Sequence, residues 1–161
     1  MQTLNVQSFR AAKGFTLIEL LITIAVLTIL LTIAVPSFRE FVQAQRVKTT
    51  SFELFAAITY ARSEALKRNG DVMLSAATGG WGSGWSISVG GTTLRSQSAI
   101  DSSVAITGSA TAVTYGRDGR TSGTGATTLQ LAPYPSVGWI SPRCITIDLS
   151  GRPNSKKGGC V

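Results

Sequence analysis

The sequence predicts an α+β fold, in which a long N-terminal helix packs on an antiparallel β-sheet head. Residues 15–70 carry the helical signal, because they are apolar from Phe15 to Val35 and amphipathic after it. The remainder is rich in Gly, Ser and Thr and divides into short strand-like segments between turn signals. With 161 residues, 43% hydrophobic and 14% charged, the chain is too apolar to be wholly disordered. We expect four parts: a short segment 1–14, a membrane-spanning helix 15–35, its amphipathic continuation 36–70, and a β-rich head 71–161.

Composition excludes several kinds of chemistry. The chain has no His and only two Cys. A His-ligated metal site and a multi-Cys zinc site are therefore excluded, as are nucleophiles that depend on a His base. We expect no metal, no cofactor and no enzymatic activity.

The stretch from Phe15 to Val35 is apolar on all sides of a helix, with Glu19 as its one charge and neither Gly nor Pro. About 20 such residues span a bilayer. A buried core helix would show a polar face, and a cleaved secretory signal would need a small-residue site after the apolar stretch. Pro36 and the residues after it offer no such site, so a membrane span is predicted.

The segment before the span carries Arg10 and Lys13 and no acid. By the positive-inside rule it stays in the cytoplasm. A single pass through the inner membrane then places everything after Pro36 across that membrane, in the periplasm of a Gram-negative bacterium.

Helical periodicity resumes directly after Pro36, so this proline is expected to kink the helix without ending it. Asn69-Gly70 is a stop signal, favoured by Lys67 and Arg68 in the last turn. Arg62 and Glu64 are expected on the solvated face. The expected apolar stripe comprises Phe38, Phe41, Val42, Phe52, Phe55, Ile58 and Ala61 or Ala65, with Val47 as a loose bridge.

The head is expected to contain strands at 71–77, 84–89, 104–107, 111–116, 127–132 and 143–149. Turn signals between them include Gly79-Gly80, Gly90-Gly91, Asp118-Gly119 and Ser150-Gly151. Trp81 and Trp85 are expected to pack inside the head at a hairpin. An antiparallel sheet against an amphipathic helix gives the α+β arrangement.

Where the span begins, residues 13–19 read Lys-Gly-Phe-Thr-Leu-Ile-Glu. This motif resembles the signal of type IV pilins and type II secretion pseudopilins. The resemblance implies that residues 1–14 are a leader peptide, which a prepilin peptidase removes between Gly14 and Phe15 before Phe15 is N-methylated. Glycine suits the cut because it has no Cβ.

The resemblance also implies that Glu19 pairs with the amino terminus of a neighbouring subunit. The alternative is that Glu19 is simply favoured near the helix N-terminus by the helix dipole.

Further motifs resemble the GspH/FimT group of pilin-like proteins. They are the segments 60–65 (YARSEA), 82–85 (GSGW), 116–120 (GRDGR) and 145–152 (ITIDLSGR). The resemblance implies a minor pilin-like fold and a role in type IV pilus assembly, for motility, adhesion or DNA uptake. A type II secretion pseudopilin of the GspH type is the alternative. The implied partners are the prepilin peptidase, other minor and major pilins or pseudopilins and the inner membrane. After assembly, the protein is expected in the pilus at the cell surface.

Cys144 and Cys160 both lie in the part expected to be exported, where disulfides persist. Their bond would resemble the C-terminal disulfide loop of many pilins. In the chain-entropy account a loop of this size contributes about 3 kcal/mol. Two free thiols are the alternative.

The C-terminal end is basic. Arg143, Arg152, Lys156 and Lys157 lie in or beside the disulfide loop, and Arg117 and Arg120 lie on a separate turn. Such cations bind nucleic-acid phosphates, so DNA is a candidate partner. Some FimT proteins are DNA receptors for transformation and carry a Gly-Arg-x-Arg element. Here the matching residues are Gly151-Arg152-Pro153-Asn154, without the second Arg. A solvated or pilin-docking basic loop is the alternative.

Overall fold

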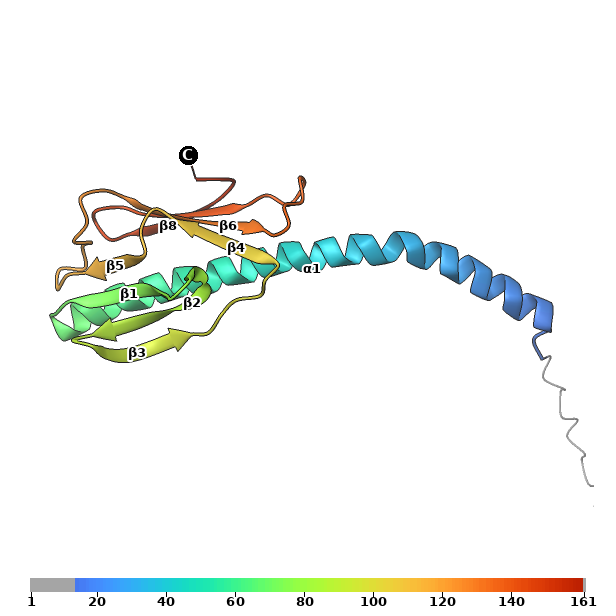
Figure 1. Ribbon diagram of the computed structural model, residues 1–161, viewed down its shortest axis with the longest axis horizontal. Helices are drawn as coiled ribbons and strands as arrows, with labels where there is room; N and C mark the ends of the chain where they lie inside the picture. Colours follow the sequence, from blue (N-terminus) through green and yellow to red (C-terminus); the bar gives the residue numbers. More distant parts are fainter. Residues whose placement is uncertain (1–13, 161) are drawn as a thin grey trace, which may run out of the picture. The chain divides into compact units, whose positions relative to one another are not determined.

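The computed structural model describes residues 14–160 and has an α+β architecture of one helix and two antiparallel sheets (Figure 1). The elements are α1 (Leu17–Arg68), β1 (Val72–Ala77), β2 (Gly80–Val89), β3 (Thr92–Gln97), β4 (Val104–Gly108), β5 (Ala112–Tyr115), β6 (Thr127–Pro133), β7 (Arg143–Ile147) and β8 (Pro153–Lys157). One sheet has the strand order β3-β2-β1-β5, and the other has the order β4-β6-β7-β8. The predicted fold class is confirmed, with two sheets in the head.

Helix α1 continues through Pro36 and ends where the sequence predicts. Asn69 adopts a left-handed φ of 50°, and the Gly70 N–H donates to the Ala65 carbonyl at 3.2 Å. This is the six-to-one bond of a Schellman motif, which satisfies a carbonyl that the helix end leaves open. Between Phe38 and Arg39 the chain divides into two compact units, which are described separately.

The N-terminal unit contains the apolar part of α1. Its most apolar 18-residue window has a mean hydropathy of 2.7, and none of it is buried. Three threonine hydroxyls on this part donate to carbonyls of their own helix, Thr23 to Leu20, Thr28 to Ile24 and Thr32 to Ile29, at 2.7–2.8 Å. Their polarity is therefore satisfied internally, as a lipid environment requires.

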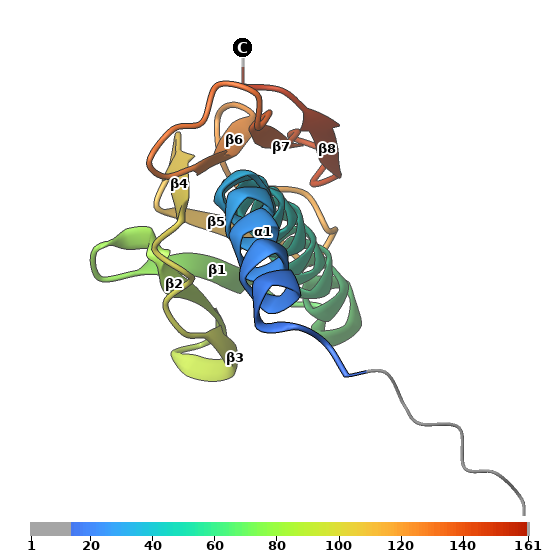
Figure 2. The same cartoon turned by 90° about the vertical axis from the view of Figure 1, so that its right-hand side faces the viewer.

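The second unit is the head, whose single core lies where both sheets flank the second half of α1 (Figure 2). The helix contributes small and branched side chains to it. Val47, Leu54, Ile58, Ala61 and Ala65 recur every three, four or seven positions and are all at most 1% exposed. This spacing keeps them on one helix face, and the small residues let the sheets approach closely.

The expected apolar stripe is wrong at three of its four phenylalanines, whereas the fourth, Phe55, is partly buried against the core. Phe38, Phe41 and Phe52 are 66%, 64% and 58% exposed, respectively. The sheets meet the helix along the face that contains Leu54 instead, and bury even Thr50 and Ser51 there. Periodicity alone did not distinguish these two faces, since both carry apolar residues at helical spacing.

All six expected strands are present, within the usual shifts of their ends, but β3 and β8 were not expected. Both are edge strands with mostly exposed polar residues, and β8 begins with a proline. An edge strand of this kind lacks the apolar alternation that predicts a half-buried strand.

Trp81 and Trp85 are buried as expected, and the Trp81 Nε1 donates to the Ala110 carbonyl at 2.8 Å.

Candidate functional site

The start of α1 is closed by a capping box. The Thr16 N–H and hydroxyl donate to Oε2 of Glu19 at 2.8 and 2.9 Å, and the Glu19 N–H donates back to the threonine hydroxyl at 3.3 Å. These reciprocal bonds satisfy donors that the first helical turn leaves open. The spacing of Thr16 and Glu19 is the capping-box signal, which the sequence analysis did not use.

Gly14 and Phe15 form the exposed peptide in front of this cap, and the Phe15 side chain is 86% exposed. Arg10, Lys13 and the remainder of the expected leader lie outside the described residues. Over the part of the chain that the structure describes, Oε1 of Glu19 receives no hydrogen bond and the carboxylate forms no ion pair. Among residues 14–160, one carboxylate oxygen caps the helix and the other has no hydrogen-bond partner.

Cys144 and Cys160 form a disulfide with Cα atoms 5.1 Å apart. A strand was expected at 143–149 and a loop after it, but the chain after the turn forms a second strand, so most of the segment between the cysteines is a β-hairpin. Strand β8 pairs with β7 in a register that sets Lys157 opposite Arg143 and Lys156 opposite Cys144. Beyond β8, the Cys160 N–H donates to Oε1 of Gln130 at 2.9 Å, which fixes the C-terminal end onto the same sheet.

The hairpin divides the expected basic residues into two groups. Arg143, Lys156 and Lys157 lie at one end, and Arg152 lies at the turn about 13 Å away, given about 3.3 Å per strand residue. Asp148 accepts hydrogen bonds from the Arg152 N–H at 3.0 Å and from the Ser150 hydroxyl at 2.6 Å. The serine hydroxyl, and then the backbone N–H of Arg152, hold the pKa of this carboxyl below its usual range. An ionised carboxylate therefore lies within the Arg152 turn.

The turn with Arg117 and Arg120, expected to be separate, lies against the Arg152 turn. A Cβ built on Gly151 would lie 2.1 Å from the Gly119 carbonyl oxygen, and both glycines have positive φ. Only glycine therefore permits this approach. The backbones of three of the six basic residues therefore lie at one end of the head: Arg117, Arg120 and Arg152.

Arg62 joins these two turns to α1. Its Nε donates to the Gly119 carbonyl at 3.0 Å, and its guanidinium donates to the Ser150 carbonyl at 3.4 Å. Arg62 and Glu64 were expected on a solvated face, and this expectation is wrong. Glu64 is 7% exposed and pairs with Arg68 at 2.6 Å, a hydrogen bond that lowers its pKa. Arg62 makes tertiary contacts that no local pattern revealed, whereas the Glu64–Arg68 pair lies within one helix at a spacing of four positions.

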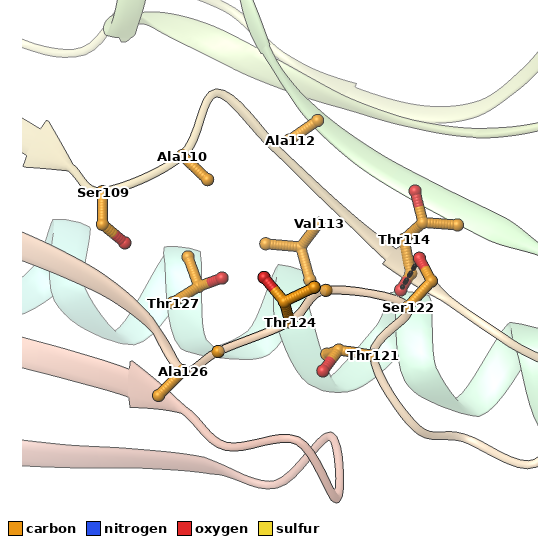
Figure 3. A pocket seen from close by; sticks show the side chains of 12 residues that line it. Ser109, Ala110, Ala112, Val113, Thr114, Thr121, Ser122, Thr124, Ala126 and Thr127 are labelled. Atoms are coloured by element: carbon orange, nitrogen blue, oxygen red, sulfur yellow. Dashed lines mark hydrogen bonds between the residues drawn. The ribbon is translucent and has the colours of Figure 1, made fainter.

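A hollow of about 420 Å³ lies beside β5, between the 109–112 and 121–127 segments (Figure 3). Serine, threonine, alanine and glycine line it together with Val113, and the Ser122 hydroxyl donates to the Thr114 carbonyl at 3.4 Å. None of its lining residues titrates near neutral pH. The hollow therefore offers no general acid or base and no charged ligand for a metal ion.

Two family models match the chain. The model described as type II transport protein GspH matches residues 52–151, and the prokaryotic N-terminal methylation motif matches residues 9–35. Among individual sequences, a Pseudomonas aeruginosa fimbrial protein is 39% identical over 69 residues, which are 43% of this chain and 44% of that protein. The type IV major alpha-pilin of Moraxella bovis is 45% identical over 49 residues, 30% of this chain and 31% of that protein. The chain thus spans less than half the length of each relative.

Solved structures share the fold. The type IV minor pilin FimU of Pseudomonas aeruginosa superposes with a TM-score of 0.64 at 21% identity, over 72% of this chain and 92% of that one. The minor pseudopilin EpsH of the Vibrio cholerae type 2 secretion system gives a TM-score of 0.55 at 10% identity, over 70% and 97% of the two chains.

Proposed function

Given that this chain belongs to the GspH family of type II transport proteins, we propose that it is a minor type IV pilin that takes part in pilus assembly. One observation carries the proposal: the apolar first part of α1 is fully uncovered, whereas the same helix later forms the centre of a folded head. Exposed apolar surface of this extent requires a cover. In this proposal, lipid covers the helix before assembly, and the helices of neighbouring subunits cover it in the filament.

The processing step follows from the N-terminal motif. A prepilin peptidase cuts between Gly14 and Phe15, and Phe15 is then N-methylated. The family motif at residues 9–35 and the exposed peptide in front of the helix cap support this step. The cut leaves the capping box intact, because the box begins at Thr16.

Glu19 serves assembly in this proposal. Its Oε2 atom caps the helix, and its Oε1 atom accepts a hydrogen bond from the methylated amine of Phe15 on a neighbouring subunit. The two roles are compatible because they use different oxygens. Methylation keeps the positive charge of the amine, so an ion pair forms in surroundings that screen charge weakly.

The proposed topology places residues 1–14 in the cytoplasm and the head in the periplasm, with one pass through the inner membrane. After assembly the head lies on the pilus at the cell surface. The Cys144–Cys160 disulfide supports an exported head, because disulfides persist in oxidising compartments. The proposed role is structural, with no catalytic step.

A type II secretion pseudopilin is the second candidate, favoured by the description of the matching family. The pilus role is supported by the fimbrial and pilin sequences that the chain resembles. A deletion strain separates the two candidates. Loss of twitching motility with normal exoprotein secretion supports the pilus, and the opposite result supports the secretion system. Mass spectrometry of the native protein tests the shared premise, since a chain that does not begin at methylated Phe15 contradicts both.

DNA contact is a third candidate, favoured by the convergence of the Arg117–Arg120 turn on the Arg152 turn. Arginines on neighbouring turns can bind phosphates by charge and hydrogen bonding. The same deletion strain, scored for natural transformation, tests whether this contact has a role in DNA uptake.

A further inference from the structure

A cleft of about 380 Å³ opens at the end of the head opposite the Arg152 turn. Helix α1 forms one wall, and the segment 139–141 with the adjoining ends of β7 and β8 forms the other. The side chains that matter here are those of Phe41, Lys48, Trp139, Arg143 and Lys157. All of them belong to the compact unit that begins at Arg39.

The cleft holds three cations and no carboxylate among its lining residues. Within residues 14–160, neither Lys48, Arg143 nor Lys157 has an acidic side chain within ion-pair distance. Arg143 and Lys157 face each other directly across the strand pair, where like charges repel. A bound carboxylate would remove this repulsion, so the cleft is electrostatically complementary to an acidic ligand.

Aromatic side chains flank the cations. Phe41 is 64% exposed and Trp139 is 58% exposed, and the Arg143 guanidinium lies 5.9 Å from the ring centre of Phe52. Phe41, Lys48 and Phe52 follow one another at seven and four positions, which keeps them on one face of α1. Exposed aromatic residues beside arginine are the composition that protein interfaces favour.

We propose that this cleft docks an acidic segment of a different pilin subunit. The inference rests on the proposed function, because it needs a neighbouring subunit. Phe41 follows Val35 by only six positions along the chain. Subunits that associate through their apolar helices therefore bring a neighbour close to this cleft.

A second copy of this chain is a poor occupant. The sequence has 15 Lys and Arg against 8 Asp and Glu. Glu64 is buried and ion-paired, and Asp101 pairs with Arg46 at 2.8 Å. Two copies would also bring two net positive heads together, so charge complementarity points to a partner with an acidic head.

Site-specific photo-crosslinking in cells that make the full-length protein tests the occupant. A benzoylphenylalanine replaces Trp139 in one strain and Ile22, in the apolar part of the helix, in a second strain. We expect the Trp139 probe to capture another pilin through a peptide that contains Asp or Glu. Capture of a second copy, or of nuclease-sensitive nucleic acid, overturns the inference. Capture of pilins by the Ile22 probe alone overturns the inference and leaves the proposed function standing, whereas capture by neither probe overturns both.

Charge reversal provides the matched control. Lys157 lines the cleft, whereas Lys156 is one position away on the same strand and points to the opposite face of the sheet. Lys157→Glu should lower the capture by the Trp139 probe about tenfold, since it places like charges together. Lys156→Glu should change the capture less than about twofold. Equal effects of the two variants would refute the assignment to this cleft.

Discussion

Leu54 and Phe52 stand two positions apart on α1, and the structure assigns them opposite roles. Leu54 is fully buried between the sheets, whereas Phe52 is 58% exposed. Leu54→Ala removes a buried isobutyl group and leaves a cavity that the surrounding sheets fill only in part. We expect a loss of about 3 kcal/mol in the free energy of unfolding of the head.

Phe52→Ala removes more atoms but costs less. Most of its ring already contacts solvent, and the Arg143 guanidinium lies 5.9 Å from the ring centre. A cation–π contact of this exposed kind contributes about 0.5–1 kcal/mol. We therefore expect a loss of roughly 1 kcal/mol or less for this variant.

Thermal unfolding of the full-length protein in detergent measures this difference. The buried indoles of Trp81 and Trp85 report on the head through their fluorescence. At roughly 4 °C per kcal/mol, Leu54→Ala should lower the melting temperature by about 12 °C and Phe52→Ala by about 4 °C at most. The buried helix face would be wrongly assigned if Phe52→Ala destabilised the head as much as Leu54→Ala, or if Leu54→Ala cost less than about 1 kcal/mol.

Three further predictions concern processing, assembly and DNA. Gly14→Leu should leave an unprocessed precursor in the membrane, because the added side chain obstructs the peptidase. The precursor would be seen as a larger band on a gel, and normal processing of the variant would contradict the proposed cleavage site. The Glu19→Gln variant should still insert in the membrane and keep the helix cap, since glutamine also serves in a capping box. It should enter filaments poorly, because the negative charge is lost. Full complementation of a deletion strain by this variant would show that only the cap matters. If the Arg152 turn binds DNA, Arg152→Ala should weaken binding in a fluorescence titration at low salt, and wild-type binding should fall steeply as salt rises. Binding that is unchanged by Arg152→Ala would place any DNA contact elsewhere.

Features that depend on contiguous residues could be predicted from the sequence alone. The unbroken apolar stretch that starts at Phe15 predicted the exposed part of the helix, and Asn69-Gly70 predicted where the helix ends. Five of the six expected strands match the observed bounds within two residues, whereas the expected strand 84–89 begins four residues after the start of β2. The pilin-like motif at residues 13–19 is likewise visible in the sequence. Each of these signals is local, because helix period, turn residues and span length act over a few neighbouring positions.

Which face of α1 is buried depends on tertiary packing, because two sheets distant in sequence select the Leu54 face over the Phe52 face. The tertiary structure also decides that β8 forms, since this polar edge strand is held by the pairing register with β7 and carries no apolar pattern of its own. The contact of Arg62 with the Gly119 and Ser150 carbonyls joins segments 57 and 88 positions apart. Such contacts depend on the relative placement of elements, which no local pattern encodes. The pairing of β7 with β8 likewise sets Arg152 apart from Arg143, Lys156 and Lys157.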